Sequence, residues 1–484
     1  MKTRTSVLII LVLILALSGK LFSQPKTNLS GLWVAKSGTS DNQGELFFSF
    51  IHSNDSLKTK VSLPMYGDKF LNVPLPSVAL KGDSIRFPSF DGKYFPEKDQ
   101  ILASINFLYE AIPFTLQRCE QVAKPVMDTA RFSTRAPQWT FITRASIWSS
   151  PLLLDDHLYF GSDDSCFYAL NAANGSLEYK YPTQGKVRGK QAVSGQNMVF
   201  SSDDGWVYCI NRRSGKLVWK TRINNGKFVR IDPSLTQGNY DYILSSPLCE
   251  GRNIYIGSTD SCLYSLDART GKIHWKFKAD HMIRATPQVY NQWVYCASWS
   301  GKCYAIDRQT GTQAWMVDLH QPVLSQPAVK DGKLVIGSRH AWLWCMDAQT
   351  GGEIWKYNYW WSWVESSPII DNGTIYIGSS DLKRILAINL QSGKTQWSYH
   401  TAGYPWSTAS TDQSLLYMGS VVQQQGGESG YIYLLDKNNG KMVEKIAVSN
   451  DSTLFMTGCY GQIAIGKSMF YASTLGGKIV AYKK

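Results

Sequence analysis

The chain has 484 residues, of which 44% are hydrophobic and 18% charged, a balance that excludes a disordered protein and leaves room for two or three domains. Its 50 Lys and Arg residues outnumber 37 Asp and Glu residues, which gives a formal charge of +13 and favours acidic partners. The basic residues are scattered rather than gathered in a stripe, which argues against nucleic-acid binding.

Residues 1–23 have the pattern of a secretory signal peptide. Lys2 and Arg4 precede an apolar run from Val7 to Leu17, and small residues follow near Ser23. The run is shorter than the ~20 residues that span a bilayer, and no Cys near its end offers a site for a lipid. We therefore expect signal cleavage, no transmembrane segment in the mature chain, and a periplasmic or extracellular location.

Residues 28–120 are expected to form a small antiparallel β-barrel or sandwich, because short alternating segments such as GLWVAK and FTLQRC lie between Gly, Asn and Asp turns. Gly31, Trp33 and Arg118 resemble the lipocalin pattern, in which a Trp on the first strand is covered by an Arg from the last. The alternative is an unrelated β-domain with a buried Trp and a surface Arg. Residues 121–135 are polar, contain one Pro, and are interpreted as a linker.

From residue 136 onward a short motif recurs at intervals of 40 to 56 residues. Most copies have an Asp or Asn, a Gly four residues later and a Trp after four more, as in the segment from Asp267 through Gly271 to Trp275. The Asp or Asn side chain can accept backbone hydrogen bonds two residues on, and Gly supplies the positive φ of a tight turn, so the motif predicts a hairpin turn. The motif glycines are Gly175, Gly215, Gly271, Gly311, Gly351, Gly393 and Gly440, and the tryptophans that we assign to structural packing are Trp139, Trp219, Trp275, Trp315, Trp355 and Trp397.

Two more apolar runs precede each turn, so one unit holds four short strands, the pattern of a β-propeller blade. Seven units are complete, and the last, MFYASTLGGKIVAYKK, stops after its third strand. The missing strand precedes the first unit, in PQWTFIT, where Trp139 lies nine residues before Trp148, as Trp275 does before Arg284. We predict an all-β chain with an eight-bladed propeller over residues 136–484, closed by the strand that contains Trp139.

The segments SLDARTGKIHW, AIDRQTGTQAW and CMDAQTGGEIW resemble the repeat of the quinoprotein-type (PQQ-like, BamB-like) β-propeller family, and the resemblance extends over about 70% of the chain. It implies the quinoprotein alcohol dehydrogenase-like propeller fold. The family includes quinone-dependent alcohol dehydrogenases and a non-catalytic subunit of the outer-membrane β-barrel assembly machinery, so the resemblance leaves the function open.

One repeat position is expected at the rim of the central channel when the units are aligned on the Gly-Ser that ends the second strand. It holds Trp148, Arg188, Leu244, Arg284, Leu324, Glu365, Trp406 and Cys459, and Lys190 lies one step deeper. We predict a pocket here in which two indoles form apolar walls and two guanidinium groups converge on a carboxylate or phosphate. Its residues are Trp148, Arg188, Lys190, Arg284, Glu365 and Trp406. The alternative is an ordinary channel lining whose charges are paired or solvated.

Three longer segments are expected on the same rim, and such a gathering often marks the working face of a repeat protein. They are RINNGKFVRIDPSLTQGNYDY between blades 2 and 3, YNYWWSWVESS between blades 5 and 6, and SVVQQQGGESG inside blade 7.

Catalytic signatures are lacking in the sequence. The HExxH, GxSxG, Walker and GxGxxG patterns do not occur, and the seven His residues show no ligand spacing. The resemblance implies that a dehydrogenase of the family would use a vicinal Cys pair, a metal held by carboxylate and amide groups, and an Asp base. Here no two of the nine Cys are adjacent, and Glu365 is the only carboxylate at the ring position.

We therefore expect an exported, non-catalytic binding or scaffold protein of the cell envelope, whose partner is an envelope protein or a small anion and which needs no cofactor or metal. The alternative is a PQQ-dependent oxidoreductase, an alcohol or sugar dehydrogenase that holds PQQ and Ca²⁺. Nine Cys are an odd number for an exported protein, so at least one is expected to be unpaired, and the pairing stays open.

Overall fold

The computed structural model describes residues 29–36, 46–53, 56–64, 71–81, 83–87, 89–107, 110–123, 132–133, 135–224, 244–339, 342–360, 362–423, 429–448 and 456–484. The predicted signal peptide, residues 1–23, lies outside these ranges. The chain divides into two compact units, Met1–Met127 and Asp128–Lys484. Within the described ranges, no helix is long and apolar enough to cross a membrane.

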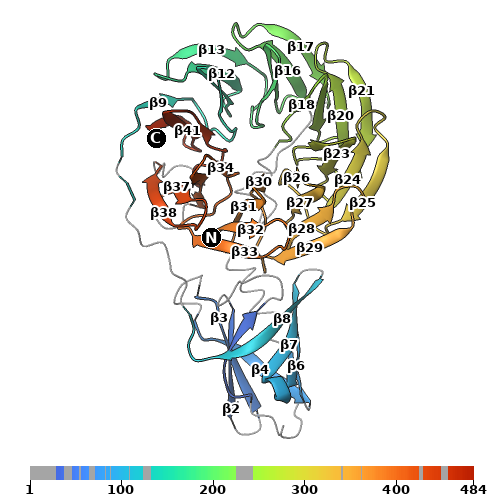
Figure 1. Ribbon diagram of the computed structural model, residues 1–484, viewed down its shortest axis with the longest axis vertical. Coiled ribbons are helices and arrows are strands. Elements are labelled where there is room, and N and C mark those ends of the chain that lie inside the picture. Colours follow the sequence, from blue (N-terminus) through green and yellow to red (C-terminus); the bar gives the residue numbers. More distant parts are fainter. Residues whose placement is uncertain are drawn as a thin grey trace. The chain divides into compact units, whose positions relative to one another are not determined.

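The first unit is a closed antiparallel β-barrel in which each strand pairs with the next and the last strand returns to the first (Figure 1). Phe48, Phe90 and Phe114 fill its core, with ring centroids 5.3 to 6.3 Å apart. A 3-10 turn, η3 (Pro96–Lys98), joins the sixth strand to the seventh. The strands are β1 (Gly31–Lys36), β2 (Phe47–Ser53), β3 (Ser56–Ser62), β4 (Val73–Lys81), β5 (Ser84–Phe87), β6 (Phe90–Phe95), β7 (Gln100–Phe107) and β8 (Glu110–Cys119).

Trp33 on β1 is fully buried, and its Nε1 donates to the Leu29 carbonyl at 3.0 Å. Arg118 on β8 lies over the Trp33 ring, with Cζ 4.3 Å from the ring centroid. Its guanidinium also donates to the Ser30 carbonyl at 2.7 Å and to an Asp99 carboxylate oxygen at 2.6 Å. The expected cover of a first-strand Trp by a last-strand Arg is therefore present, and the domain is a barrel rather than a sandwich.

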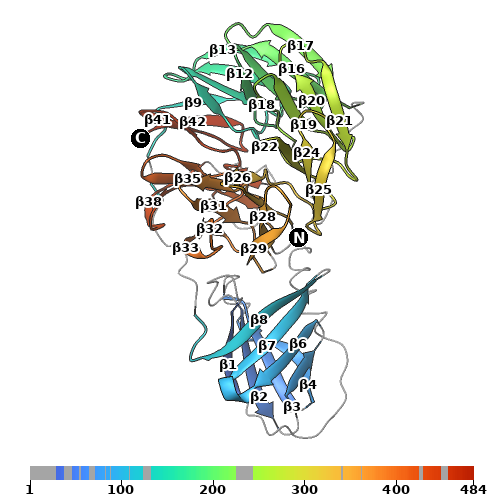
Figure 2. The same ribbon diagram turned by 45° about the vertical axis from the view of Figure 1, so that its right-hand side comes forward.

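The second unit is an eight-bladed β-propeller whose blades follow one another around a ring (Figures 1 and 2), which confirms the predicted fold class. The middle strands of each blade are short apolar runs, because both of their faces pack against neighbouring blades. Blades 1 to 4 comprise β10 (Leu152–Leu154), β11 (His157–Gly161), β12 (Cys166–Asn171) and β13 (Leu177–Pro182); β14 (Ala192–Ser194), β15 (Asn197–Ser201), β16 (Trp206–Asn211) and β17 (Leu217–Arg222); β18 (Leu248–Glu250), β19 (Asn253–Gly257), β20 (Cys262–Asp267) and β21 (Ile273–Lys278); and β22 (Gln288–Tyr290), β23 (Trp293–Ala297), β24 (Lys302–Asp307) and β25 (Gln313–Asp318).

Blades 5 to 8 follow the same antiparallel order, with one additional strand that leaves blade 7. They comprise β26 (Ala328–Lys330), β27 (Lys333–Gly337), β28 (Trp342–Asp347) and β29 (Glu353–Asn358); β30 (Ile369–Asp371), β31 (Thr374–Ser379), β32 (Arg384–Asn389) and β33 (Thr395–His400); β34 (Ser410–Thr411), β35 (Leu415–Gly419), β37 (Tyr431–Asp436) and β38 (Met442–Ala447); and β40 (Ala464–Ile465), β41 (Met469–Ser473), β42 (Lys478–Lys483) and β9 (Trp139–Ile142).

Blade 8 is completed by the N-terminal strand of the propeller. β9 pairs with β42 in antiparallel register, with Trp139 opposite Ala481 and Ile142 opposite Lys478. The predicted closure is therefore confirmed, and the two ends of the ring are joined within one sheet.

The repeated motif forms the turn that was predicted from its sequence. In blade 3, Asp267 Oδ1 accepts hydrogen bonds from the backbone amides of Arg269 and Thr270 at 3.1 and 2.8 Å, and Gly271 adopts φ +72°. The ring of Trp219, from blade 2, packs so closely against this turn that a Cβ at Gly271 would lie 2.5 Å from it. The Nε1 of such a Trp donates to a carbonyl of the next blade, from Trp139 to Ala172, Trp219 to Ala268, Trp275 to Arg308, Trp315 to Ala348, Trp355 to Leu390 and Trp397 to Lys437.

The longer rim segments are described in part. The extra strand β36 (Val421–Gln423) of the blade 7 insertion pairs with β39 (Met456–Gly458), and Val421 and Met456 pack against Trp406. Tyr359 and Trp360, between blades 5 and 6, are buried. Most of the segment between blades 2 and 3, residues 225–243, lies outside the described ranges.

Candidate functional site

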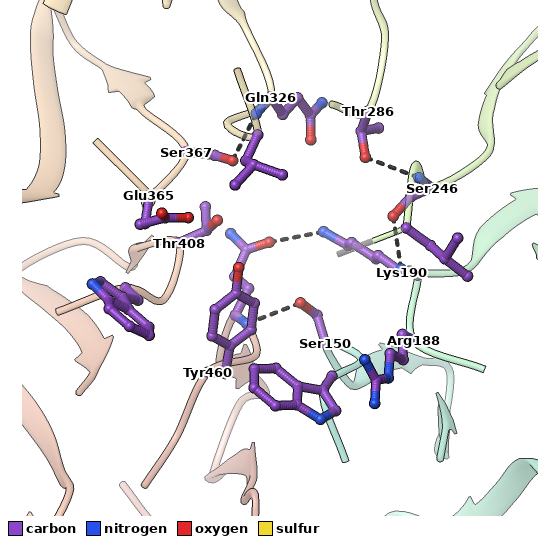
Figure 3. A pocket seen from close by; sticks show the side chains of 16 residues that line it. Ser150, Arg188, Lys190, Ser246, Thr286, Gln326, Glu365, Ser367, Thr408 and Tyr460 are labelled. Carbon is purple, nitrogen blue, oxygen red and sulfur yellow. Dashed lines mark hydrogen bonds between the residues drawn. The ribbon is translucent and has the colours of Figure 1, made fainter. Parts of the chain in front are cut away.

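A cavity of about 100 Å³ lies where all eight blades converge (Figure 3). Most of its lining comes from the segments that lead into the innermost strands, which is where the repeat alignment located the ring. In blade 8 the lining residue is Tyr460 and not the predicted Cys459, which is fully buried. Five of the six predicted pocket residues line it, namely Trp148, Arg188, Lys190, Glu365 and Trp406. The other lining residues are Ser150, Gly189, Leu244, Ser246, Thr286, Leu324, Gln326, Ser367, Thr408, Tyr460 and Gln462.

The apolar side of the cavity is aromatic. Trp148 packs edge-on against Tyr460, with ring centroids 5.1 Å apart, and Trp406 stacks on Tyr404 at 5.4 Å. Burial raises the pKa of the Tyr460 hydroxyl, and the nearby Glu365 raises it further. These rings therefore present flat walls and neutral donors rather than charge.

Arg188 reaches the cavity already paired with Asp163. Its Nε and Nη2 donate to the two carboxylate oxygens at 2.7 and 2.5 Å, and the two side chains are 9% and 8% exposed. The guanidinium Cζ also lies 5.4 Å from the centroid of the Trp148 ring. A bidentate pair of this kind compensates most of the charge that Arg188 would otherwise direct into the cavity.

Glu365 forms a second buried pair, with Arg339. Arg339 Nε lies 2.7 Å from Glu365 Oε1, and each side chain is only 3% exposed. The guanidinium is held between two indoles, with Cζ 5.1 Å from the Trp299 ring centroid and 4.7 Å from that of Trp363. In Figure 3, Glu365 and Arg188 lie on opposite sides of the cavity, and each carries its own counter-charge.

Sequence reasoning missed the partners of the ring residues, although a signal was present. Asp163, Arg339 and Ser380 all occupy the stretch directly after the second strand of their blades, and each contacts the ring residue of the next blade. In the third case Trp406 Nε1 donates to Ser380 Oγ at 2.9 Å. The residue after the aligned Gly-Ser therefore determines what the following ring residue can do.

The prediction that Arg284 lines the same pocket as Arg188 was wrong. Arg284 is fully buried and lines a separate space of about 20 Å³, together with Asn224, Thr259 and Leu244. A side chain at the ring position can point toward the channel axis or into the space between blades, and the Arg284 side chain points into the space between blades. The two guanidinium groups therefore do not converge on one ligand.

Lys190 extends into the middle of the cavity, where its Nζ donates to Gln462 Oε1 at 2.8 Å (Figure 3). The Lys190 side chain is exposed to solvent, yet the protein surrounds it closely enough that desolvation lowers the pKa of its ammonium. Lys190 and Gln462 also line a second cavity of about 390 Å³, which continues along the inner strands β10, β34 and β40. The channel therefore passes Lys190 on its way through the ring.

Hydrogen bonds between blades form a collar at the level of Lys190. We define the collar as Ser150, Lys190, Ser246, Thr286, Gln326, Ser367, Thr408 and Gln462. A backbone amide of one blade donates to a hydroxyl of the next in four places: Lys190 to Ser246 at 2.7 Å, Ser246 to Thr286 at 3.0 Å, Gln326 to Ser367 at 2.9 Å, and Gln462 to Ser150 at 2.9 Å. These bonds fix the positions of the hydroxyl groups around the cavity.

Sequence comparison identifies one family. A profile described as outer membrane protein assembly factor BamB matches residues 132–236, 203–322 and 300–483, which together span the propeller. A search among curated proteins gives no match.

Solved structures with a similar fold include proteins of different kinds. BamB from Moraxella catarrhalis is 14% identical with a TM-score of 0.56, over 72% of this chain and 99% of that one. A europium-containing methanol dehydrogenase is 13% identical with a TM-score of 0.55, over 69% of this chain and 84% of that one. Quinohemoprotein alcohol dehydrogenase from Comamonas testosteroni is 12% identical with a TM-score of 0.55, over 72% and 76%. At these identities the likeness shows the propeller fold alone.

Proposed function

Because the chain belongs to the family of the outer membrane protein assembly factor BamB, we propose that it is an exported, non-catalytic propeller that binds a protein partner in the cell envelope. The observation that carries this proposal is the family match through the whole propeller, residues 132–483. The signal-like sequence of residues 1–23 supports export, with a periplasmic or extracellular destination.

The lining of the central cavity does not suit PQQ and Ca²⁺. A Ca²⁺ ion takes roughly six to eight oxygen ligands, several of them carboxylates. Among the described lining residues Glu365 is the one carboxylate, and Arg339 already holds it at 2.7 Å. Among the described lining residues, the charged group without a carboxylate partner is the Lys190 ammonium, which repels a cation.

The volume of the cavity also argues against a bound quinone. Its volume of about 100 Å³ is below the roughly 300 to 1,000 Å³ typical of organic ligand sites. In addition, no group of three or more His, Cys, Asp or Glu side chains in the described ranges is arranged to hold a metal ion. We therefore propose that the protein acts without a quinone cofactor.

The alternative is a PQQ-dependent alcohol or sugar dehydrogenase. It rests on the shared fold of the two dehydrogenase structures, at 13% and 12% identity. One experiment separates the two functions. The purified full chain is mixed with PQQ and Ca²⁺, and dye-linked oxidation of alcohols and sugars is followed, with Glu365→Gln as the matched variant. We expect no turnover from either protein, and turnover by the wild-type chain would overturn the proposal.

Location and partnership need a second experiment. In cells, the full chain is expected in the envelope fraction, where site-specific photo-crosslinkers on the described rim should give a discrete adduct with one envelope protein. A deletion of residues 2–23 is the control and should leave the protein inside the cell, without the adduct. A full chain that stays in the cytoplasm would contradict the proposal.

We also propose that the central cavity binds a small anion. Of the three cations on or next to its lining, Arg188 and Arg339 each have a carboxylate partner, whereas Lys190 is bonded to a neutral amide. Among the residues that the structure describes, the cavity and its immediate partners therefore carry one uncompensated positive charge, that of Lys190.

A further inference from the structure

The collar presents hydrogen-bond donors to the cavity. Ser150, Ser246, Thr286 and Ser367 each accept a hydrogen bond from a backbone amide. A hydroxyl has one hydrogen to donate, and no acceptor for these four hydrogens is found among the residues that the structure describes. Each hydroxyl is therefore held in place through its oxygen while its hydrogen remains available.

Lys190 adds further donors in the same space. Its ammonium has three hydrogens, and the bond to Gln462 Oε1 uses one of them. The remaining two lie in the cavity that the four hydroxyls also line (Figure 3). An ionised carboxylate or a halide only accepts hydrogen bonds, so it matches a site made of donors.

The size and charge of the site limit what can enter. At ~30 Å³ for each water molecule, a cavity of about 100 Å³ has room for roughly three waters. Its single uncompensated charge favours a singly charged ion over phosphate or sulfate, which would bring excess negative charge into a partly desolvated site. The adjoining cavity of about 390 Å³ offers a route from solvent.

We propose that the collar binds one small monovalent anion, of the size of chloride, formate or acetate, between the Lys190 ammonium and the hydroxyl groups of Ser150, Ser246, Thr286 and Ser367. The proposal deepens the anion binding proposed above and moves its centre from the arginines of the rim to the collar. The ligand bridges blades 1, 2, 3, 4 and 6, so its binding ties the inner ends of these blades together.

The anion should stabilise the protein by mass action, which allows a direct test. Thermal unfolding of the full chain is followed at constant ionic strength while sodium gluconate, whose anion is too large for the cavity, is replaced by sodium formate, acetate or chloride. We expect the melting temperature to rise with the logarithm of the small-anion concentration once that concentration exceeds the dissociation constant. Lys190→Met should weaken binding by at least about tenfold, because it removes the charged donor of the collar.

Two matched variants locate the site. Lys186→Met removes a lysine of the same blade that lies 3.6 Å from Asp163 and does not line the cavity, and it should keep the response. Arg188→Met separates the collar from the rim. A response lost with Arg188→Met but kept with Lys190→Met would overturn the collar assignment and leave anion binding at the rim. The absence of any rise with the small anions over gluconate in the wild-type protein would overturn both.

A measurement on the unaltered chain covers the case in which Lys190→Met fails to fold. Exchange of chloride with a protein site broadens the ³⁵Cl NMR line of the chloride in solution. If formate binds at the same collar, it should displace the chloride and narrow the line again. Broadening that persists at saturating formate, or that gluconate reverses equally well, would contradict the proposal.

Discussion

Replacing Glu365 by Gln should destabilise the propeller strongly, because it leaves the Arg339 guanidinium buried beside a neutral amide. Both side chains of the pair are 3% exposed, and breaking a buried pair by removing one partner costs ~3–5 kcal/mol. The Trp299 and Trp363 rings still face the guanidinium in the variant, so we expect a value near ~4 kcal/mol. For the roughly 350 residues of the propeller, at ~2.1 cal/mol/K per residue, this lowers the melting temperature by about 5 °C.

The assay is urea unfolding of the full chain, monitored by tryptophan fluorescence. Calorimetry of the same protein separates the thermal transitions of the barrel and the propeller. Glu353→Gln is the control, because Glu353 belongs to the same blade as Arg339 and pairs with Lys356 at 3.7 Å on the surface. It should change the free energy of unfolding by less than ~1 kcal/mol. The double variant Arg339→Met with Glu365→Gln should recover much of the loss, because no buried charge remains. If Glu365→Gln is as stable as Glu353→Gln, or if the double variant is worse than the single one, the reasoning is refuted.

Three further predictions concern other parts of the chain. His400 is buried, and desolvation, together with repulsion by the charges of Arg384 and Lys383, lowers its pKa from 6.5 to about 4. As the pH falls, the unfolded state therefore takes up the proton before the folded state does. About 3 kcal/mol of stability should be lost between pH 6.5 and pH 4. His400→Phe should flatten this dependence in urea unfolding at several pH values, and an unchanged slope would contradict the prediction. Trp139→Ala should cost ~2–4 kcal/mol and expose β9 to limited proteolysis, and a proteolysis rate equal to that of the wild type would argue against its anchoring role. Arg118→Met should destabilise the barrel by ~1–3 kcal/mol and lower the temperature of the barrel transition alone in calorimetry. A shift confined to the propeller transition would argue against the contact with Trp33.

The number of blades and their closure could be predicted because the repeat is encoded locally. An Asp or Asn, a Gly with positive φ and a Trp lie within nine residues, and each copy builds its own turn, as Asp267, Gly271 and Trp275 do. The strand that completes blade 8 could be found because Trp139 keeps the spacing of the motif. The barrel was predicted less fully, since its strands carry no repeat and only Trp33 and Arg118 mark where its ends meet.

The chemistry of the ring could be predicted only in part, because a ring residue takes its partner from the preceding blade. Arg188 meets Asp163 at a sequence separation of 25, and Glu365 meets Arg339 at 26. A single repeat position gives the location of a side chain but not the direction of its end, as the burial of Arg284 between blades demonstrates. Lys190 was expected to assist the arginines and instead occupies the centre of the site.

The pairing of β9 with β42 determines when the ring can be sealed during folding. Thr143 donates to the Gly477 carbonyl across a separation of 334 residues, and closing a loop of this length costs ~5 kcal/mol of chain entropy. Blades 1 to 7 can pack one upon another without that cost, whereas the seam needs Lys478–Lys483, which follow every other strand of the ring. Until those six residues are in place, the molecule keeps two open sheet edges that other chains and proteases can reach. Pairing of β9 with β42 is therefore the step that removes the open edges, and a propeller that lacks it should be degraded or aggregate sooner than a closed one.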